Sequence, residues 1–312
     1  MAITAAMVKE LREKTGAGMM DCKKALAATD GNEDAAIEWL REKGLATAQK
    51  KASRIAAEGI AYTLVAEDGK SAVVVEVNSE TDFVAKNEKF QAYVGEVAAQ
   101  ALASDAADMD AFMAEAWNGD ASKTVAEALA AEIAVIGENL KIRRFEKVVE
   151  ANGFVASYIH AGGKIGVLVD VEADVVNDDI KEMARNIAMQ VAALKPLYTT
   201  RAEISADYIA HEKEVLLAQI MNDPKESQKP EKVIKGIIEG RVNKELKEIC
   251  LVDQIYVKAE DGKQTVQQYI DSVAKANGAN LAVKSYVRFE TGEGLEKKVE
   301  DFAAEVAAQR KG

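Results

Sequence analysis

Cysteine, proline, histidine and aromatic residues are all scarce in this sequence. The 312 residues include 2 cysteines, 3 prolines and 2 histidines, and 5% of them are aromatic. Cys22 and Cys250 are too few for a disulfide framework and lack the spacing of a metal site, so we expect a reducing compartment. Because proline and aromatics are few while alanine is abundant, the composition favours helices in thin, closely packed layers.

Long apolar stretches are missing as well. No segment approaches the ~18 to 20 apolar residues needed to span a membrane, and the N-terminus gains charged residues too early for a signal peptide. The formal net charge of −12 repels phosphate backbones. We interpret the one short basic cluster, at Lys50, Lys51 and Arg54, as a solvated helix face. We therefore expect a cytoplasmic protein that binds neither membranes nor nucleic acid directly.

Catalytic motifs are not recognisable. Neither His160 nor His211 has a cysteine or serine beside it in a familiar nucleophile arrangement. The segment DGKS at 68–71 imitates the end of a phosphate-binding loop, but Leu64 stands where the loop needs its first glycine, and a strand-like run follows. We predict a protein that is not an enzyme and holds no metal or cofactor. A hydrolase or transferase site assembled in space stays an alternative, as does a generic helical adaptor.

The first 44 residues read as three short helices with clear ends. Thr4 is placed to cap the first helix and Gly16 to end it, while Asn32 caps the third helix and Gly44 ends it. This pattern predicts a three-helix module with a very small core. The expected apolar members of that core are Val8, Leu11, Leu26, Ile37 and Leu40.

Two adjacent methionines, Met19 and Met20, begin the second of these helices. Neighbouring residues on a helix point about 100° apart, so both side chains can hardly belong to a core this small. We expect one methionine to pack inside and the other to be exposed. An exposed thioether is flexible and suits a binding surface.

An internal repeat organises the centre of the chain, at an offset of 94 residues. The matched pairs are Gly59 with Gly153, Gly69 with Gly163, Lys70 with Lys164, Glu76 with Asp170, and Val73, Val75 and Val77 with Val167, Val169 and Val171. Each copy reads as a strand, a tight turn, a more apolar strand and a helix. The segment RFE, at 144–146 and again at 288–290, closes the two copies. We predict two related subdomains, each a small antiparallel sheet covered by helices on one face.

The segment NSETDFV places an aromatic residue among acidic and hydroxyl residues, directly after an apolar strand. Phe83 either staples the following helix to the core or is presented to a partner. The second copy has Asn177 at the matching position, so the repeated fold does not require an aromatic there. We interpret Asp82 and Phe83 as an exposed tip, and Val84 and Phe90 as the residues that attach it to the core.

Two further helical segments are expected outside the repeat. Residues 203–222 and 231–250 form a hairpin inserted into the second copy, joined by a turn that holds Pro224 and Pro230. Such a hairpin has too little core of its own, so we expect it to pack on a second copy or a partner. After a Gly-x-Gly hinge, residues 292–312 read as an amphipathic helix that either clasps its own body or docks on a partner.

Five stretches, in order along the chain, together resemble bacterial translation elongation factor Ts. They are VKELREKTGAGMMDCKKAL at 8–26, EVNSETDFVAKNEKF at 76–90, IGENLKIRRFE at 136–146, HAGGKIGVLV at 160–169 and FETGEG at 289–294. The match covers essentially the whole chain and follows the family's domain order. Around 103–125 and 146–153 the family varies in length, so no role is carried over to those residues.

The resemblance implies an α+β fold whose N-terminal module is similar to ubiquitin-associated domains. The expected domains are the N-terminal module and connector (1–54), core subdomain one (55–150), core subdomain two (151–202 with 251–291), the inserted helical hairpin (203–250) and the C-terminal helical module (292–312). The hairpin matches the family's coiled-coil or dimerisation segment. A homodimer or a two-plus-two complex through this hairpin is therefore an open alternative.

The resemblance also implies a function, namely that of a guanine-nucleotide exchange factor for elongation factor Tu. Such a factor binds GDP-bound and nucleotide-free elongation factor Tu, disturbs its magnesium and phosphate site, and promotes GDP release so that GTP can bind during translation elongation. The residues expected to disturb the partner's magnesium site are Thr81, Asp82, Phe83 and Val84. The other expected partner contacts are Leu11, Met19, Met20, Ile136, Gly137 and His160, with the C-terminal helix docking on the partner's GTPase domain.

Overall fold

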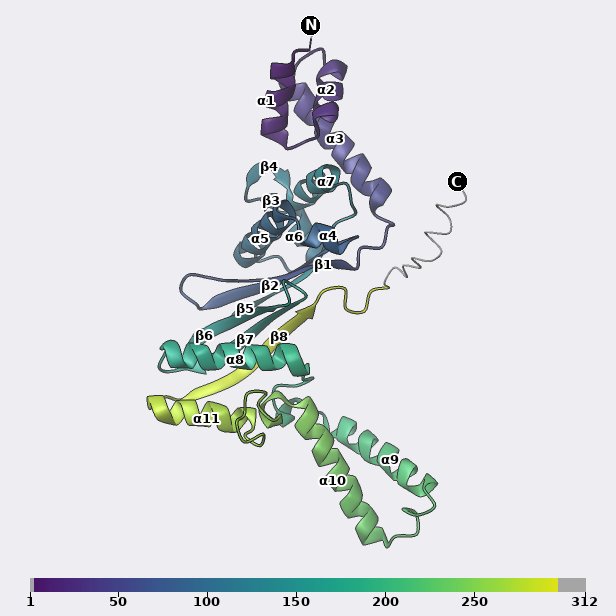
Figure 1. The fold of residues 1–312 in the computed structure, drawn as a ribbon, viewed down its shortest axis with the longest axis vertical. Helices are drawn as coiled ribbons and strands as arrows, with labels where there is room; N and C mark the ends of the chain where they lie inside the picture. The colour runs from purple at the N-terminus through teal and green to yellow at the C-terminus, as the bar shows by residue number, and fades with distance from the viewer. Residues whose placement is uncertain (1–2, 297–312) are drawn as a thin grey trace.

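The structure, a computed structural model, describes residues 3–296. Three parts follow one another along its longest axis (Figure 1): a three-helix module, two antiparallel sheets with their helices, and a helical hairpin at the opposite end. The predicted α+β class is confirmed. None of the described helices is long and apolar enough to cross a membrane. The division into domains stays a prediction.

The N-terminal module has the predicted helix ends. Its helices are α1 (Ala5–Thr15), α2 (Met19–Ala28) and α3 (Glu33–Lys51). Thr4 caps α1 by accepting a hydrogen bond from the Met7 amide, and Gly16 ends α1 in the left-handed region at φ 68°. Asn32 caps α3 through the Ala35 amide. Val8, Leu11 and Leu26 are buried in the small core, and Ile37 and Leu40 pack against it, as expected.

Gly44 does not end the third helix, and this prediction is wrong. The helix continues to Lys51, so residues 45–51 of the expected connector are its last part. Gly44 is buried against α7 (Val125–Ile136), where an added Cβ would lie 3.5 Å from the carbonyl oxygen of Ala130. The glycine therefore serves close packing of two helices rather than termination.

The two copies of the repeat form two three-stranded antiparallel sheets. The first has the order β1 (Glu58–Val65), β2 (Ser71–Ser79), β5 (Lys141–Val149), and the second β6 (Gly153–His160), β7 (Ile165–Ala173), β8 (Leu281–Glu290). The valines that revealed the repeat are buried on the central strands β2 and β7, and both RFE segments lie on the closing strands. The predicted pair of related sheets is confirmed.

Helices cover the outer face of each sheet. The first sheet packs against α5 (Glu88–Ala103) and α7, the second against α8 (Asp178–Leu194) and α11 (Val266–Asn277). An insertion after α5 contains α6 (Met109–Ala114), β3 (Ala116–Trp117) and β4 (Asp120–Thr124). Phe112 and Trp117 of this insertion are buried in the core of the first sheet.

The inner faces of the two sheets pack on each other, which the sequence did not reveal. Ala61, Val74, Leu168 and Phe289 lie in a buried cluster that draws on both sheets. The backbone also joins them, since the Ala61 amide donates to the carbonyl oxygen of Gly163 at 2.7 Å. The order of layers is thus helices, sheet, sheet, helices, as Figure 1 shows.

A buried carboxylate fastens the end of β8 to the first sheet. Glu76 on β2 is 0% exposed and accepts hydrogen bonds from Arg143 (3.0 Å), Arg144 (2.6 Å) and the Gly292 amide (2.8 Å). Burial alone would raise the pKa of Glu76, but these bonds, with one from Asn78, outweigh it and lower the pKa. The FETGEG segment therefore has a structural role here.

Asp170, the counterpart of Glu76 in the second copy, has a different environment. It is 7% exposed, and its Oδ1 atom has no hydrogen-bond partner. Burial and the adjacent Glu150 carboxylate raise the pKa of Asp170 to about 6. Lys284 instead lowers the pKa of Glu150 to about 2. Asp170 is thus the member of this pair that takes up a proton as the pH falls through about 6.

Asp170→Asn should become more stable relative to the parent as pH rises. In the unfolded chain the carboxyl loses its proton near 3.8, whereas folded Asp170 keeps it to about 6, so the parent's free energy of unfolding falls between these values. Asparagine has no proton to lose, so its contribution to stability does not change over this pH range. Urea denaturation at about pH 4.5 and about pH 7.5 measures the free energy of unfolding of both proteins. The advantage of Asp170→Asn over the parent should grow by roughly 1 kcal/mol or more between these two pH values. A difference that does not change with pH would contradict the assigned pKa of Asp170.

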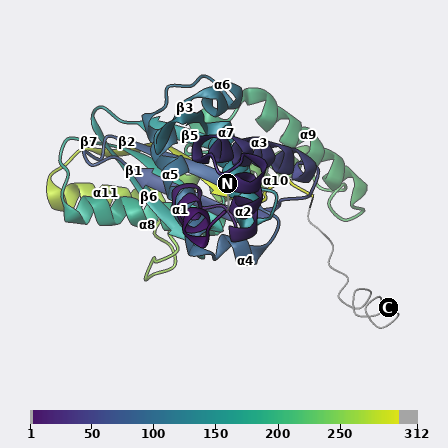
Figure 2. The ribbon, with the colours of Figure 1, turned by 90° about the horizontal axis from the view of Figure 1, so that it is seen from above.

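The inserted hairpin projects from the body, as Figure 1 and Figure 2 show. Its helices are α9 (Ala206–Asn222) and α10 (Glu231–Ile249), flanked by the short 3-10 helices η1 (Arg201–Glu203) and η2 (Leu251–Asp253). Apolar residues of the two helices face each other and form its core, among them Ile220, Ile238 and Leu246. Most of the predicted C-terminal helical module (292–312), namely residues 297–312, lies outside the described residues.

Candidate functional site

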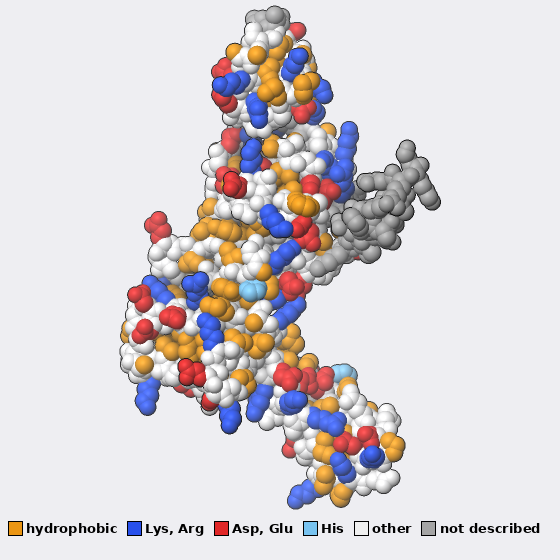
Figure 3. Space-filling model, viewed as in Figure 1, with side chains coloured by type: hydrophobic (Ala, Val, Ile, Leu, Met, Phe, Trp, Pro, Cys, Tyr) orange, Lys and Arg blue, Asp and Glu red, His pale blue; other side chains and the backbone are white. Residues whose placement is uncertain are grey.

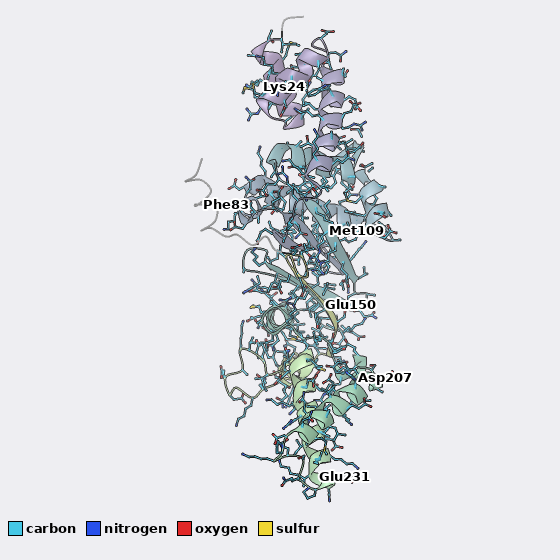
Figure 4. The ribbon with its side chains drawn as sticks, turned by 90° about the vertical axis from the view of Figure 1, so that its right-hand side faces the viewer. Lys24, Phe83, Met109, Glu150, Asp207 and Glu231 are labelled. Atoms are coloured by element: carbon cyan, nitrogen blue, oxygen red, sulfur yellow. The ribbon has the colours of Figure 1, made fainter. Side chains whose placement is uncertain are left out.

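Phe83 lies in a short helix, α4 (Asp82–Ala85), that directly follows β2. Its side chain is 80% exposed, the highest value among the exposed large hydrophobic side chains of the described residues. In Figure 4 it lies at the margin of the body, away from the core. Val84 packs against the core of the first sheet, and Phe90 is fully buried there. The staple interpretation of Phe83 is therefore wrong, and the exposed-tip interpretation is confirmed. We call residues 81–85 the Phe83 turn.

The Phe83 turn is held by hydrogen bonds from both sides. The Thr81 hydroxyl accepts a hydrogen bond from the Val84 amide at 3.4 Å and so caps α4. Thr81 also donates twice to the carboxylate of Glu138, from its amide (3.0 Å) and its hydroxyl (2.7 Å). Ser79 donates to the Thr81 carbonyl oxygen at 2.9 Å. An exposed aromatic ring thus stands on a fixed backbone.

The loop that supplies Glu138 is itself fixed. Helix α7 ends at Gly137, whose φ of 86° is in the left-handed region. The carbonyl oxygen of Gly137 accepts a hydrogen bond from Lys51 at the end of α3. The Asn139 amide donates to Glu80 at 2.5 Å, and its side chain donates to the Arg54 carbonyl oxygen at 2.8 Å. Two members of the basic cluster interpreted as a solvated helix face, the Lys51 side chain and the Arg54 backbone, therefore tie the end of α3 to this loop.

An ion pair stands beside the exposed ring. Lys86 contacts the Asp82 carboxylate at 2.6 Å, and its ammonium nitrogen lies 6.0 Å from the centre of the Phe83 ring. The hydrogen bond from Lys86 lowers the pKa of Asp82. The Phe83 turn thus presents an apolar ring and an ionised carboxylate together.

Both methionines of the N-terminal module are exposed, Met19 at 58% and Met20 at 62%. The prediction that one of them packs inside is wrong, because Cys22 and Leu26 already fill the buried face of α2. Leu11 is 0% exposed and belongs to the module's core. Leu11 is therefore not accessible on the surface of the free module, and its direct contact with a partner stays a prediction.

His160 stands exposed at the end of β6, before the turn to β7. Its Nδ1 atom lies 3.0 Å from the hydroxyl of Tyr158. The turn is tight, since Ala161, Gly162 and Gly163 all have positive φ. An added Cβ at Gly163 would lie 2.7 Å from Cγ2 of Ile60, so this turn packs directly on the first sheet.

The structure joins some of the predicted contact residues and leaves others apart. The Phe83 turn and the loop with Ile136 and Gly137 meet through Glu138, whereas His160 and the two methionines lie on separate elements. On the face in Figure 3, acidic and basic side chains of the described residues are interspersed. Sequence reasoning missed Glu138 and Lys86. The i,i+4 spacing of Asp82 and Lys86 was a usable signal, but nothing local links Thr81 to a residue 57 positions away.

Comparisons with known proteins identify the family of this chain. The model of the family described as elongation factor TS matches residues 80–293, more than half of the chain, and the UBA/TS-N domain model matches residues 6–40. Elongation factor Ts of Clostridioides difficile (strain 630) is 51% identical over 309 residues, covering 99% of each chain. Elongation factor Ts of Trichlorobacter lovleyi is 50% identical, covering 99% of this chain and 98% of its own. That of Clostridium novyi (strain NT) is 48% identical, covering 98% of each. The chain therefore belongs to the elongation factor Ts family of translation elongation factors.

Proposed function

We propose that this protein is a guanine-nucleotide exchange factor for elongation factor Tu and acts by binding alone. The single observation that carries the proposal is the Phe83 turn, in which a ring that is 80% exposed stands on a hydrogen-bonded base beside an ionised carboxylate. An exposed aromatic of this kind suits insertion into a partner. We propose that Thr81, Asp82, Phe83 and Val84 enter the partner's GTPase domain near its magnesium and phosphate sites.

Exchange requires the factor to prefer nucleotide-free partner over GDP-bound partner. By linkage, the factor then weakens GDP binding by the same ratio. A shift of ~10⁴ in that ratio needs about 5.5 kcal/mol of differential affinity. The ring of Phe83 can push apart side chains that pack together in the partner's GTPase domain, and Asp82 can compete for the polar groups around the partner's magnesium ion. No covalent step is needed.

Anchoring contacts away from the Phe83 turn would hold the partner while the turn acts. We propose that Met19 and Met20, the loop at Ile136 and Gly137, and His160 supply them, because each is exposed or half-buried on a different element. Their separation along the molecule suits a partner with several domains (Figure 1).

The helical hairpin is proposed to mediate a homodimer or a two-plus-two complex. Leu217, Met221 and Val233 expose apolar side chains on it, in addition to the residues of its own core. Sedimentation velocity of the protein alone and with elongation factor Tu distinguishes these assemblies from a monomer.

Release of a fluorescent GDP analogue from elongation factor Tu tests the proposed function. The protein is added at a small fraction of the partner concentration, together with excess unlabelled nucleotide. Every partner molecule should then release the analogue faster than it does spontaneously. Acceleration limited to one partner per molecule of the protein, or none at all, would sink the proposal.

Replacing both Met19 and Met20 with alanine should raise the half-saturating concentration of the protein roughly tenfold and leave the maximal release rate near that of the parent. These side chains contribute to binding in our account, and about 1.4 kcal/mol corresponds to tenfold in affinity. Val149→Ala is a matched control, because Val149 is also exposed (65%) but lies on β5. A lower maximal rate with unchanged half-saturation would show that the methionines act on release instead.

A further inference from the structure

One carboxylate, that of Glu138, connects the loop after α7 to the Phe83 turn. It accepts both hydrogen bonds that Thr81 can donate, at 3.0 Å from the amide to Oε2 and at 2.7 Å from the hydroxyl to Oε1. A second hydrogen bond joins the same two segments with donor and acceptor reversed, since the Asn139 amide of the loop donates to the Glu80 carboxylate at 2.5 Å. Residues 80–81 and 138–139 are therefore joined in both directions.

The Glu138 contact decides how Thr81 caps α4. A threonine hydroxyl has one hydrogen, and here that hydrogen is directed to Glu138, which leaves the oxygen's lone pairs for the Val84 amide. Helix α4 has only 4 residues, too few to be stable by itself. The direction of the Phe83 side chain thus depends on the orientation of Thr81, and that orientation depends on Glu138.

We infer that Glu138 is the positioning residue of the Phe83 turn, and that the turn and the loop at 136–140 act as one unit. The loop in turn is bound to the end of α3 through Lys51 and Arg54. This inference rests on the proposed function, because it assigns Glu138 a part in the same exchange reaction. Glu138 contacts Thr81 and needs no contact with the nucleotide.

Rates of GDP release for Glu138 and Thr81 variants test the inference. Glu138→Ala should lower the maximal rate about ten- to a hundredfold, since misplacing a working group by about 1 Å can cost that much. Its half-saturating concentration should stay near that of the parent, because the proposed anchors Met19, Met20 and His160 lie on other elements. Glu138→Gln should recover most of the rate, because its amide oxygen can still accept from the Thr81 amide.

A double-mutant cycle then separates positioning from an independent contribution. If Glu138 acts through Thr81, then Glu138→Ala combined with Thr81→Val should be about as slow as the slower single variant. If the fold reductions of the two single variants multiplied in the double variant, or if Glu138→Ala released GDP at the parent's rate, the inference would be overturned. Should Glu138→Ala not fold, as judged from its melting temperature, Thr81→Val carries the test, because it removes the hydroxyl that donates to Glu138. An unchanged release rate in that variant would overturn the inference.

Hydrogen exchange of the free protein gives a readout that does not depend on exchange activity. Amides of residues 81–86 should take up deuterium faster in Glu138→Ala than in the parent, while those of the turn after His160 stay unchanged. Faster uptake together with a parent that does not promote GDP release would leave the positioning role standing and sink the proposed function. Unchanged uptake at 81–86 would overturn the positioning role itself.

Discussion

Phe83→Ala is expected to slow GDP release from elongation factor Tu by roughly 30- to 1,000-fold, which corresponds to the ~2 to 4 kcal/mol of an interface hot spot. The loss should appear in the maximal rate, because in the proposed mechanism the ring supplies the interaction that favours the nucleotide-free partner. The free energy of unfolding should change by no more than about 0.5 kcal/mol, since the side chain is 80% exposed. Stopped-flow release and urea denaturation measure the two quantities.

Phe90→Ala is the matched control for this prediction. Phe90 lies close in sequence but is 0% exposed in the core of the first sheet. Its truncation should cost about 3 to 5 kcal/mol of stability. A Phe83→Ala variant that releases GDP like the parent, or that loses stability like Phe90→Ala, would contradict the role assigned to the Phe83 turn.

Glu76→Ala is expected to destabilise the protein by about 3 to 5 kcal/mol, the usual cost of removing one partner of a buried ion pair. The variant leaves Arg143 without a carboxylate and the Gly292 amide without its acceptor. It leaves Arg144 with only the more distant Glu293 carboxylate, at 3.7 Å. Because the bonds to Glu76 lower its pKa, its stabilising contribution is present above the ordinary carboxyl range and is lost as the pH falls. The difference in free energy of unfolding between the parent and Glu76→Ala should therefore become smaller at acidic pH.

Glu146→Ala serves as the control for Glu76→Ala. Glu146 lies exposed on the neighbouring strand β5, so its loss should change stability by no more than about 0.5 kcal/mol. Urea denaturation of both variants at neutral pH decides the matter. If Glu76→Ala were as mild as its control, the buried carboxylate would not be what fastens β8 to the first sheet.

Local patterns in the sequence predicted the elements well, because they depend on nearby residues. The caps at Thr4 and Asn32 and the paired valine strands are short-range signals, and the structure has them. Gly44 misled because a glycine that ends a helix and a glycine that admits a neighbouring helix look alike in sequence. Only the position of α7 distinguishes the two.

Contacts between distant segments were beyond such reasoning. The exposed tip could be inferred because Asn177 replaces Phe83 in the second copy, whereas its support by Glu138 depends on where α7 ends in space. The packing of the two sheets on their inner faces was hidden for the same reason. Ala61 and Leu168 read as ordinary strand residues, and their burial becomes evident only when both sheets are in place.

The most direct test of the account compares the affinities of the parent and of Phe83→Ala for nucleotide-free and GDP-bound elongation factor Tu, by titration calorimetry. The parent should bind the nucleotide-free partner far more tightly, by a ratio on the order of 10⁴ for a shift of about 5.5 kcal/mol. In Phe83→Ala this ratio should collapse, mainly through weaker binding of the nucleotide-free form. Equal ratios in the two proteins would contradict the claim that the Phe83 turn drives GDP release.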